Sequence, residues 1–93
     1  MDSTNFNVEI NSDVKSTADK DGFVLLDVRK GVYYSLNGTG GTIWAKLLEG
    51  LAPPSIIDFL AENFGKPHEQ IRGDLQRFLQ SLEKKGLIRI NAE

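Results

Sequence analysis

The side chains able to do acid–base or metal chemistry are few in this chain and lie far apart in its sequence. It has one histidine, His68, and no cysteine, so a transition-metal site lacks its usual ligands. We expect His68 to be a surface residue at a helix start. The acidic residues are scattered, and Asp19 and Asp21 lie in a polar turn, so no two carboxylates have the spacing of a general acid and its partner.

One glycine-rich segment, Gly38-Thr39-Gly40-Gly41, precedes a predicted helix and resembles a phosphate-binding loop only in composition. It lacks the lysine of a P-loop and the glycine spacing of a dinucleotide site. Gly40 and Gly41 mark either a close approach of the backbone to another element or an unwound first helical turn. We therefore expect no cofactor and no metal, and a protein that is not an enzyme.

The size and composition are those of one small soluble domain. The chain has 93 residues, of which 40% are hydrophobic and 26% charged, and its net charge of −2 gives no general attraction to nucleic acid. Its apolar runs are far shorter than the roughly 20 residues that span a membrane, and its first residues have no signal-peptide pattern. We expect one cytoplasmic domain over residues 1–93, with an ordered core of about residues 6–90, frayed ends and no membrane contact.

The first half of the chain alternates with the period of β-strands. Phe6–Ile10 and Val14–Ala18 alternate weakly, and the second is either a separate short strand or an extension of the first edge. Phe23–Val28 is apolar on both faces, which predicts a central strand covered on both sides. The tight connection Arg29–Gly31 leads into Val32–Leu36, at one end of the strand order. These runs predict a three-stranded antiparallel meander.

The apolar period then changes to 3.6, which predicts three helices joined by short loops. Trp44 is expected in the core. The third helix has a clear apolar stripe, and Leu87–Ile90 is a short terminal strand that could return to the sheet. The first predicted helix is Thr39–Glu49, with Thr39 as its N-cap and Gly50 after its end. The second begins at Pro53 and ends at Gly65, and the third begins at Pro67 and ends at Gly86.

Strands followed by three helices predict an α+β, winged-helix-like domain in which the second and third helices form a helix-turn-helix pair. This architecture serves both DNA-binding and peptide-binding proteins, so it does not decide the function. A DNA-reading third helix would carry Glu69, Asp74 and Glu83 toward the phosphates. Because the basic pairs Arg29-Lys30 and Lys84-Lys85 form no continuous stripe, the electrostatic signature of DNA binding is missing.

Peptide binding fits the sequence better. Val32–Leu36 has neither the charge nor the proline that normally protects an edge strand, so a partner could add one more strand there. Tyr34 is in phase with Val32 and Leu36 and is expected to pack against the helices, whereas Tyr33 points the other way and is the better contact candidate. Gly73, inside the third helix, marks either close approach by a partner strand or no special role.

Two motifs resemble the PqqD-like family, small domains also called RiPP recognition elements. The motifs are Asp27-x-x-x-Gly31-x-Tyr33-Tyr34-x-Leu36-Asn37-x-Thr39-Gly40-x-x-Ile43-Trp44 and Ile71-x-x-Asp74-Leu75-x-x-Phe78-Leu79-x-x-Leu82-x-x-x-Gly86-Leu87-Ile88. The resemblance covers residues 14–90 and implies a domain that holds the leader of a ribosomally made peptide during its modification. The residue pairs Tyr33-Tyr34 and Thr39-Gly40 look most like those of the stand-alone family members in lasso-peptide pathways.

The resemblance also implies a binding site. The leader would add as a strand to the backbone of Val32, Tyr33, Tyr34, Ser35 and Leu36. An apolar pocket would be lined by Tyr33 and by Leu75, Phe78, Leu79 and Leu82 of the third helix, with Asp74 and Arg77 on its rim.

The partners implied are the precursor's leader peptide and a maturation enzyme, in lasso pathways a separate leader peptidase of the cysteine-protease type. The alternatives are a peptide chaperone for a radical enzyme in quinone-cofactor biosynthesis and a winged-helix DNA-binding module. We expect a monomer, with a strand-swapped dimer through the open edge as the alternative.

Overall fold

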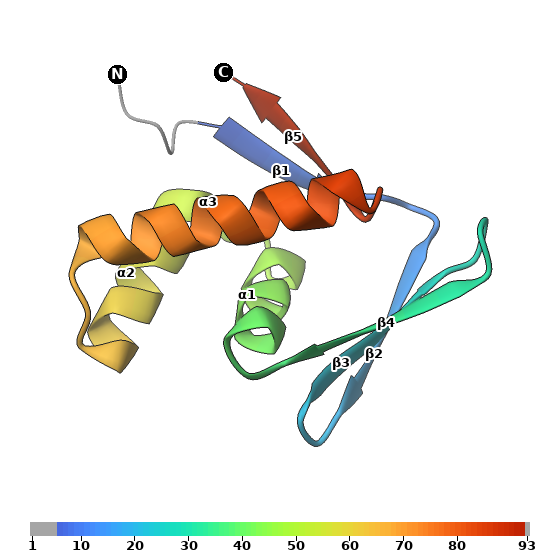
Figure 1. Cartoon of the computed structure of the whole chain (residues 1–93), viewed down its shortest axis with the longest axis horizontal. Coiled ribbons are helices and arrows are strands. Elements are labelled where there is room, and N and C mark those ends of the chain that lie inside the picture. Colours follow the sequence, from blue (N-terminus) through green and yellow to red (C-terminus); the bar gives the residue numbers. More distant parts are fainter. Residues whose placement is uncertain (1–5, 93) are drawn as a thin grey trace.

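The computed structural model of the chain describes residues 6–92. The predicted fraying of the two ends concerns residues 1–5 and 93, which lie outside the described residues. It confirms an α+β, winged-helix-like fold of a three-stranded antiparallel sheet followed by helices (Figure 1). The strands are β1 (Phe6–Ile10), β2 (Val14–Asp19), β3 (Gly22–Asp27), β4 (Val32–Asn37) and β5 (Ile88–Ala92), and the helices are α1 (Gly38–Leu48), α2 (Pro53–Phe64) and α3 (His68–Lys84).

The predicted meander is the sheet β2-β3-β4, with β3 in the centre and β4 at one edge. Its register places Leu25 opposite Tyr34. The connection between β3 and β4 is held by Asp27, whose buried carboxylate accepts hydrogen bonds from the backbone N–H groups of Arg29 and Lys30, both at 3.1 Å. This turn fixes where β4 starts and therefore which of its residues face the helices.

The terminal strand does not return to this sheet. Instead β5 pairs with β1 in a separate antiparallel ribbon. Phe6–Ile10 is therefore a strand of its own, separate from the three-stranded sheet that contains β2. Asn11 joins the two ends of the chain, because its backbone N–H donates to the Leu87 carbonyl at 3.0 Å and its side-chain amide donates to the Gly86 carbonyl at 2.9 Å. Figure 1 shows this ribbon beside α3, apart from the three-stranded sheet.

The expectation that β3 is covered on both sides is wrong. All three helices lie to one side of the β2-β3-β4 sheet (Figure 1). On that side Leu25 is fully buried, whereas on the other face Val24 and Leu26 are only half-buried and Val28, just beyond the strand, is 48% exposed. Leu26 lies opposite Tyr33, so cross-strand neighbours rather than a second layer shield the apolar outer face.

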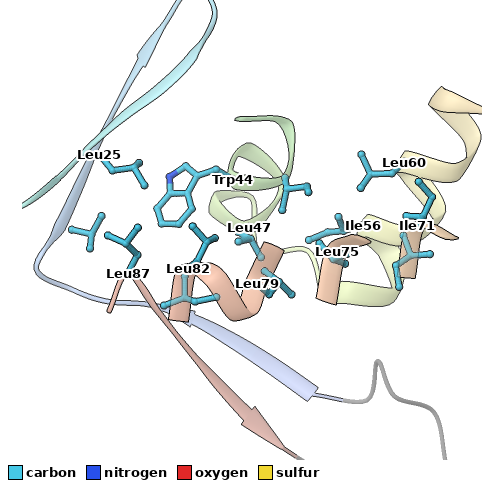
Figure 2. Close-up of a cluster of buried hydrophobic side chains, with 14 of the residues drawn as sticks. Leu25, Trp44, Leu47, Ile56, Leu60, Ile71, Leu75, Leu79, Leu82 and Leu87 are labelled. Carbon is cyan, nitrogen blue, oxygen red and sulfur yellow. The ribbon is translucent and has the colours of Figure 1, made fainter. Parts of the chain in front are cut away.

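Trp44 of α1 is at the centre of the core, as expected. It is fully buried, and Figure 2 shows its indole pointing toward Leu25 of β3, with Leu82 and Leu87 close by. Its Nε1–H donates to the Ser16 hydroxyl at 2.9 Å, which satisfies the one polar atom that this large side chain takes out of water. Trp44 thereby joins α1 to two strands of the sheet and to α3.

The junction between β4 and α1 differs from the prediction by one residue at the helix start and by two at the N-cap. The helix begins at Gly38 with Asn37 as its N-cap residue, so Thr39 is not the cap. The backbones are nevertheless as close as the two glycines suggested: a Cβ on Gly41 would lie 2.9 Å from the Leu36 carbonyl oxygen. The predicted glycines after the three helices are confirmed by their positive φ values, which are 85° at Gly50, 64° at Gly65 and 79° at Gly86.

We predict that Gly41→Ala lowers the free energy of unfolding by about 1–3 kcal/mol, because the new methyl group must push α1 away from the backbone of β4. Gly73→Ala is the matched control. Its Cβ would meet only the Arg77 guanidinium at 3.6 Å, so the change should be neutral or stabilise the helix by up to about 1 kcal/mol. Urea unfolding of both variants tests this, and equal effects would contradict the close approach at Gly41.

Candidate functional site

Strand β4 offers an open edge. It pairs with β3 on one side, and no strand among residues 6–92 pairs with its other side. Its six residues include no charge and no proline. The opposite outer strand, β2, carries Lys15 and Asp19, charges of the kind that discourage edge-to-edge association. The sheet therefore has one edge with protecting charges and one edge without them.

The direction of the backbone groups at this edge follows from the ladder. The Val28 N–H donates to the Asp13 carbonyl at 2.9 Å, so the backbone of Val28 points toward β2. Because backbone groups alternate along an antiparallel strand, those of Leu25 point the other way, toward Tyr34 of β4. The same alternation along β4 leaves the N–H and C=O groups of Tyr33 and Ser35 directed at the open edge.

A groove of about 480 Å³ begins at the end of this edge and runs between α1 and α3 to the end of α2. Its apolar floor consists of side chains that are buried in the core. The residues that line it are Ser35, Leu36, Asn37, Thr39, Gly40, Ile43, Leu60, Phe64, Lys66, Ile71, Asp74, Leu75 and Phe78.

Gly40 sets the width of this groove. A Cβ on Gly40 would lie 3.2 Å from the Phe78 ring, so the absence of a side chain lets Phe78 of α3 lie close to the first turn of α1. Both glycines of the pair therefore serve close approach, Gly41 toward β4 and Gly40 toward α3. The alternative of an unwound first turn is excluded, since both lie inside the regular helix α1.

The sequence-derived site residues divide into three groups. Ser35, Leu36, Asp74, Leu75 and Phe78 line the groove together. On the sheet, Tyr33 is 67% exposed on the face away from the helices, Tyr34 packs against the core as expected, and Val32 is 39% exposed near the hairpin. Leu79 and Leu82 are buried in the core and do not line the groove, at 0% and 2% exposure.

The rim of the groove on α3 carries an ion pair. Arg77 donates to the Asp74 carboxylate one helical turn earlier, and both side chains are solvent-exposed. Exposed pairs of this kind contribute at most about 1 kcal/mol to stability. Asp74 lines the groove, whereas its partner Arg77 does not, and the pair contributes little to folding.

Several groove residues were missed by the sequence reasoning. Phe64 and Lys66 come from the end of α2 and the loop after it, which the predicted site did not include. Phe64 is 46% exposed, an unusual position for a phenylalanine that the helical pattern places on a buried face. The pattern gave no signal for Lys66, because a lysine in a loop is ordinary.

Residues 6–92 contain no group of three or more metal-binding side chains and no helix long and apolar enough to cross a membrane.

Comparison with known proteins shows the family of this chain. The family model described as coenzyme PQQ synthesis protein D, or PqqD, matches residues 22–88. The chain belongs to the PqqD family. The match runs from β3 to the start of β5 and so includes the open edge and the whole groove of this PqqD-family domain.

Two solved structures resemble this PqqD-family domain closely. The first, titled "TbiB1 in Complex with the TbiA(beta) Leader Peptide", has 32% sequence identity and a TM-score of 0.84, covering 87% of this chain and 94% of that one. The second, titled "Lasso peptide synthetase B1 complexed with the leader peptide", has 26% identity and a TM-score of 0.82, covering 89% and 98%. A search of curated proteins gave no match.

The division between groove and core predicts different costs for two neighbouring residues of α3. Leu79→Ala should lower the free energy of unfolding by about 2–5 kcal/mol, because it leaves a cavity in a fully buried position. Phe78→Ala should cost only about 1 kcal/mol, since this half-buried ring borders the groove. Urea unfolding measures both, and a larger loss for Phe78→Ala would contradict the assignment.

Proposed function

We propose that this domain binds the leader segment of a ribosomally made precursor peptide as an added strand on β4 and presents it to a separate maturation enzyme. The observation that carries the proposal is the open edge of β4, which lacks protecting charges and lies beside an apolar groove. Both similar solved structures are titled as complexes with a leader peptide, which supports a leader as the occupant.

The edge and the groove contribute differently to binding. An added strand would pair with the outward N–H and C=O groups of Tyr33 and Ser35, which any peptide sequence can do. Side chains on alternate residues of that strand would then lie against Phe78 and Leu75 of α3. These contacts must exceed the cost of ordering a disordered leader, about 2–5 kcal/mol or more, so we expect the groove to select leaders with large apolar side chains.

The domain would have no catalytic activity of its own. By holding the leader it would raise the concentration of the precursor at the partner enzyme. We propose the leader peptidase of a lasso-peptide pathway, a separate cysteine protease, as this partner, because both similar structures carry lasso-pathway or leader-peptide titles. The second candidate is a peptide chaperone for a radical enzyme in quinone-cofactor biosynthesis, which the description of the family model supports.

DNA binding has less support. The candidate recognition helix, α3, carries exposed Glu69, Asp74 and Glu83, and the chain as a whole is acidic with a net charge of −2. The phosphates of a DNA duplex would therefore face acidic side chains on α3 instead of the basic ones that bind them. Any binding through phosphates would also weaken steeply as the salt concentration rises.

Calorimetric titration tests the proposal. The probe is a synthetic leader from the precursor encoded beside this gene, and the control is a duplex DNA titrated under the same conditions. We expect saturable binding at micromolar or tighter Kd with the leader and no heat with the duplex. Absence of leader binding by the folded protein would contradict the proposal, and a salt-dependent DNA response would favour the DNA-binding alternative.

A proline at the edge tests strand addition itself. Ser35→Pro removes an N–H group that faces the edge rather than β3, so the sheet should tolerate it, while leader affinity should fall at least about tenfold. Ser35→Ala, which keeps the N–H group, is the matched control and should bind like the unchanged protein. Circular dichroism establishes that both variants are folded. A folded Ser35→Pro with full affinity would show that the leader does not pair with this edge.

A further inference from the structure

Lys66, in the loop between α2 and α3, is a groove-lining cation without an ion-pair partner among residues 6–92. Only two of its lining side chains, Lys66 and Asp74, are charged at neutral pH. The Asp74 carboxylate is paired with Arg77, whereas Lys66 makes no hydrogen bond or ion pair within residues 6–92. Lys66 is therefore an unpaired positive charge on the groove of a chain whose net charge is −2.

Glu69 and Glu62 are the acidic residues closest in sequence to Lys66, and Glu62 of α2 makes no ion pair with it within residues 6–92. Asp58 and Glu69 have other partners. Asp58 of α2 lies 3.1 Å from Nε2 of His68, and Glu69 of α3 lies 4.0 Å from the Arg72 guanidinium. The first turn of α1, which also lines the groove, has no acidic residue. Within residues 6–92, Lys66 thus has no carboxylate in an ion pair with it.

The apolar surroundings of Lys66 would strengthen its attraction to a carboxylate of a bound peptide. Leu60 and Ile71 form a buried apolar floor, and Phe64 stands exposed beside them at the end of α2. Charges interact more strongly beside apolar protein than in bulk water. The groove leads here from Ser35–Asn37 at the end of β4, so a peptide paired with the edge would continue toward Lys66.

We propose that Lys66 binds the side-chain carboxylate of an aspartate or glutamate in the bound peptide, just outside the segment that pairs with β4. The proposal rests on the proposed function and adds to it the class of peptide: an apolar strand-forming segment flanked by an acidic residue. Lys66 is then a specificity-determining residue, since the strand pairing and the apolar floor do not distinguish one charge from another.

Fluorescence anisotropy with labelled synthetic leader, from the precursor encoded beside this gene, tests the assignment. Lys66→Glu should weaken binding about tenfold, because it replaces an attraction with a repulsion. The matched control is Lys15→Glu, the same charge change on exposed β2 at the opposite edge of the sheet, which should weaken binding less than about twofold.

The partner carboxylate is found with leaders in which each aspartate is replaced by asparagine and each glutamate by glutamine. One such replacement should weaken binding to the unchanged protein several-fold and have no effect on binding to Lys66→Gln. A lysine at that position of the leader should restore affinity for Lys66→Glu.

Two results would overturn the inference while leaving leader binding intact. In the first, Lys66→Glu and Lys15→Glu bind the leader equally well. In the second, no leader carboxylate depends on Lys66, including the case of a leader without an acidic residue. Failure of the unchanged protein to bind the leader at all would instead remove the proposed function on which the inference rests.

Discussion

Among residues 6–92, strand β4 pairs with β3 alone, and the proposed function depends on how that strand is held in place. β3 supplies its hydrogen bonds, Tyr34 packs its inner face against the core, and the chain passes from Asn37 directly into α1 without a loop. Gly41 brings α1 so near that a single methyl group would not fit against Leu36. The open edge is consequently fixed relative to the groove, and a bound strand would need to order only itself.

The edge and the groove answer two separate requirements of peptide recognition. In the proposed function, backbone pairing at Tyr33 and Ser35 would provide affinity that does not depend on the partner's sequence, while the groove beside Phe78 would provide selection among side chains. Gly40 lies between the two, because its missing side chain lets Phe78 of α3 approach the first turn of α1 next to the point where β4 ends.

The sequence alone was sufficient for the elements and for most of the edge. The alternation of Val32–Asn37 and the phase of its two tyrosines predicted which of them packs inward, because side chains on a strand alternate strictly. The sequence could not predict which apolar residues of α3 are buried in the core and which line the groove. Leu79 and Phe78 are neighbours in one helical pattern, and only the position of α1 decides that the first is enclosed and the second borders an opening.

Two other features were beyond local patterns because they depend on distant parts of the chain. The pattern of Phe23–Val28 predicts burial on both faces, yet no element among residues 6–92 forms a second layer on its outer face, since the β1-β5 ribbon forms a separate sheet. Lys66 enters the groove through the placement of the loop between α2 and α3, which no spacing in the sequence encodes. Residue type and period thus predict elements, and tertiary packing assigns their faces.

Amide hydrogen exchange of the free and leader-saturated protein tests the central claim most directly. In the free domain the amides of Tyr34 and Leu36 should exchange slowly, because they pair with β3, and those of Tyr33 and Ser35 should exchange fast. Saturation with the leader should slow exchange at Tyr33 and Ser35 specifically. Unchanged fast exchange at both residues, with the leader demonstrably bound, would contradict strand addition at the edge of β4.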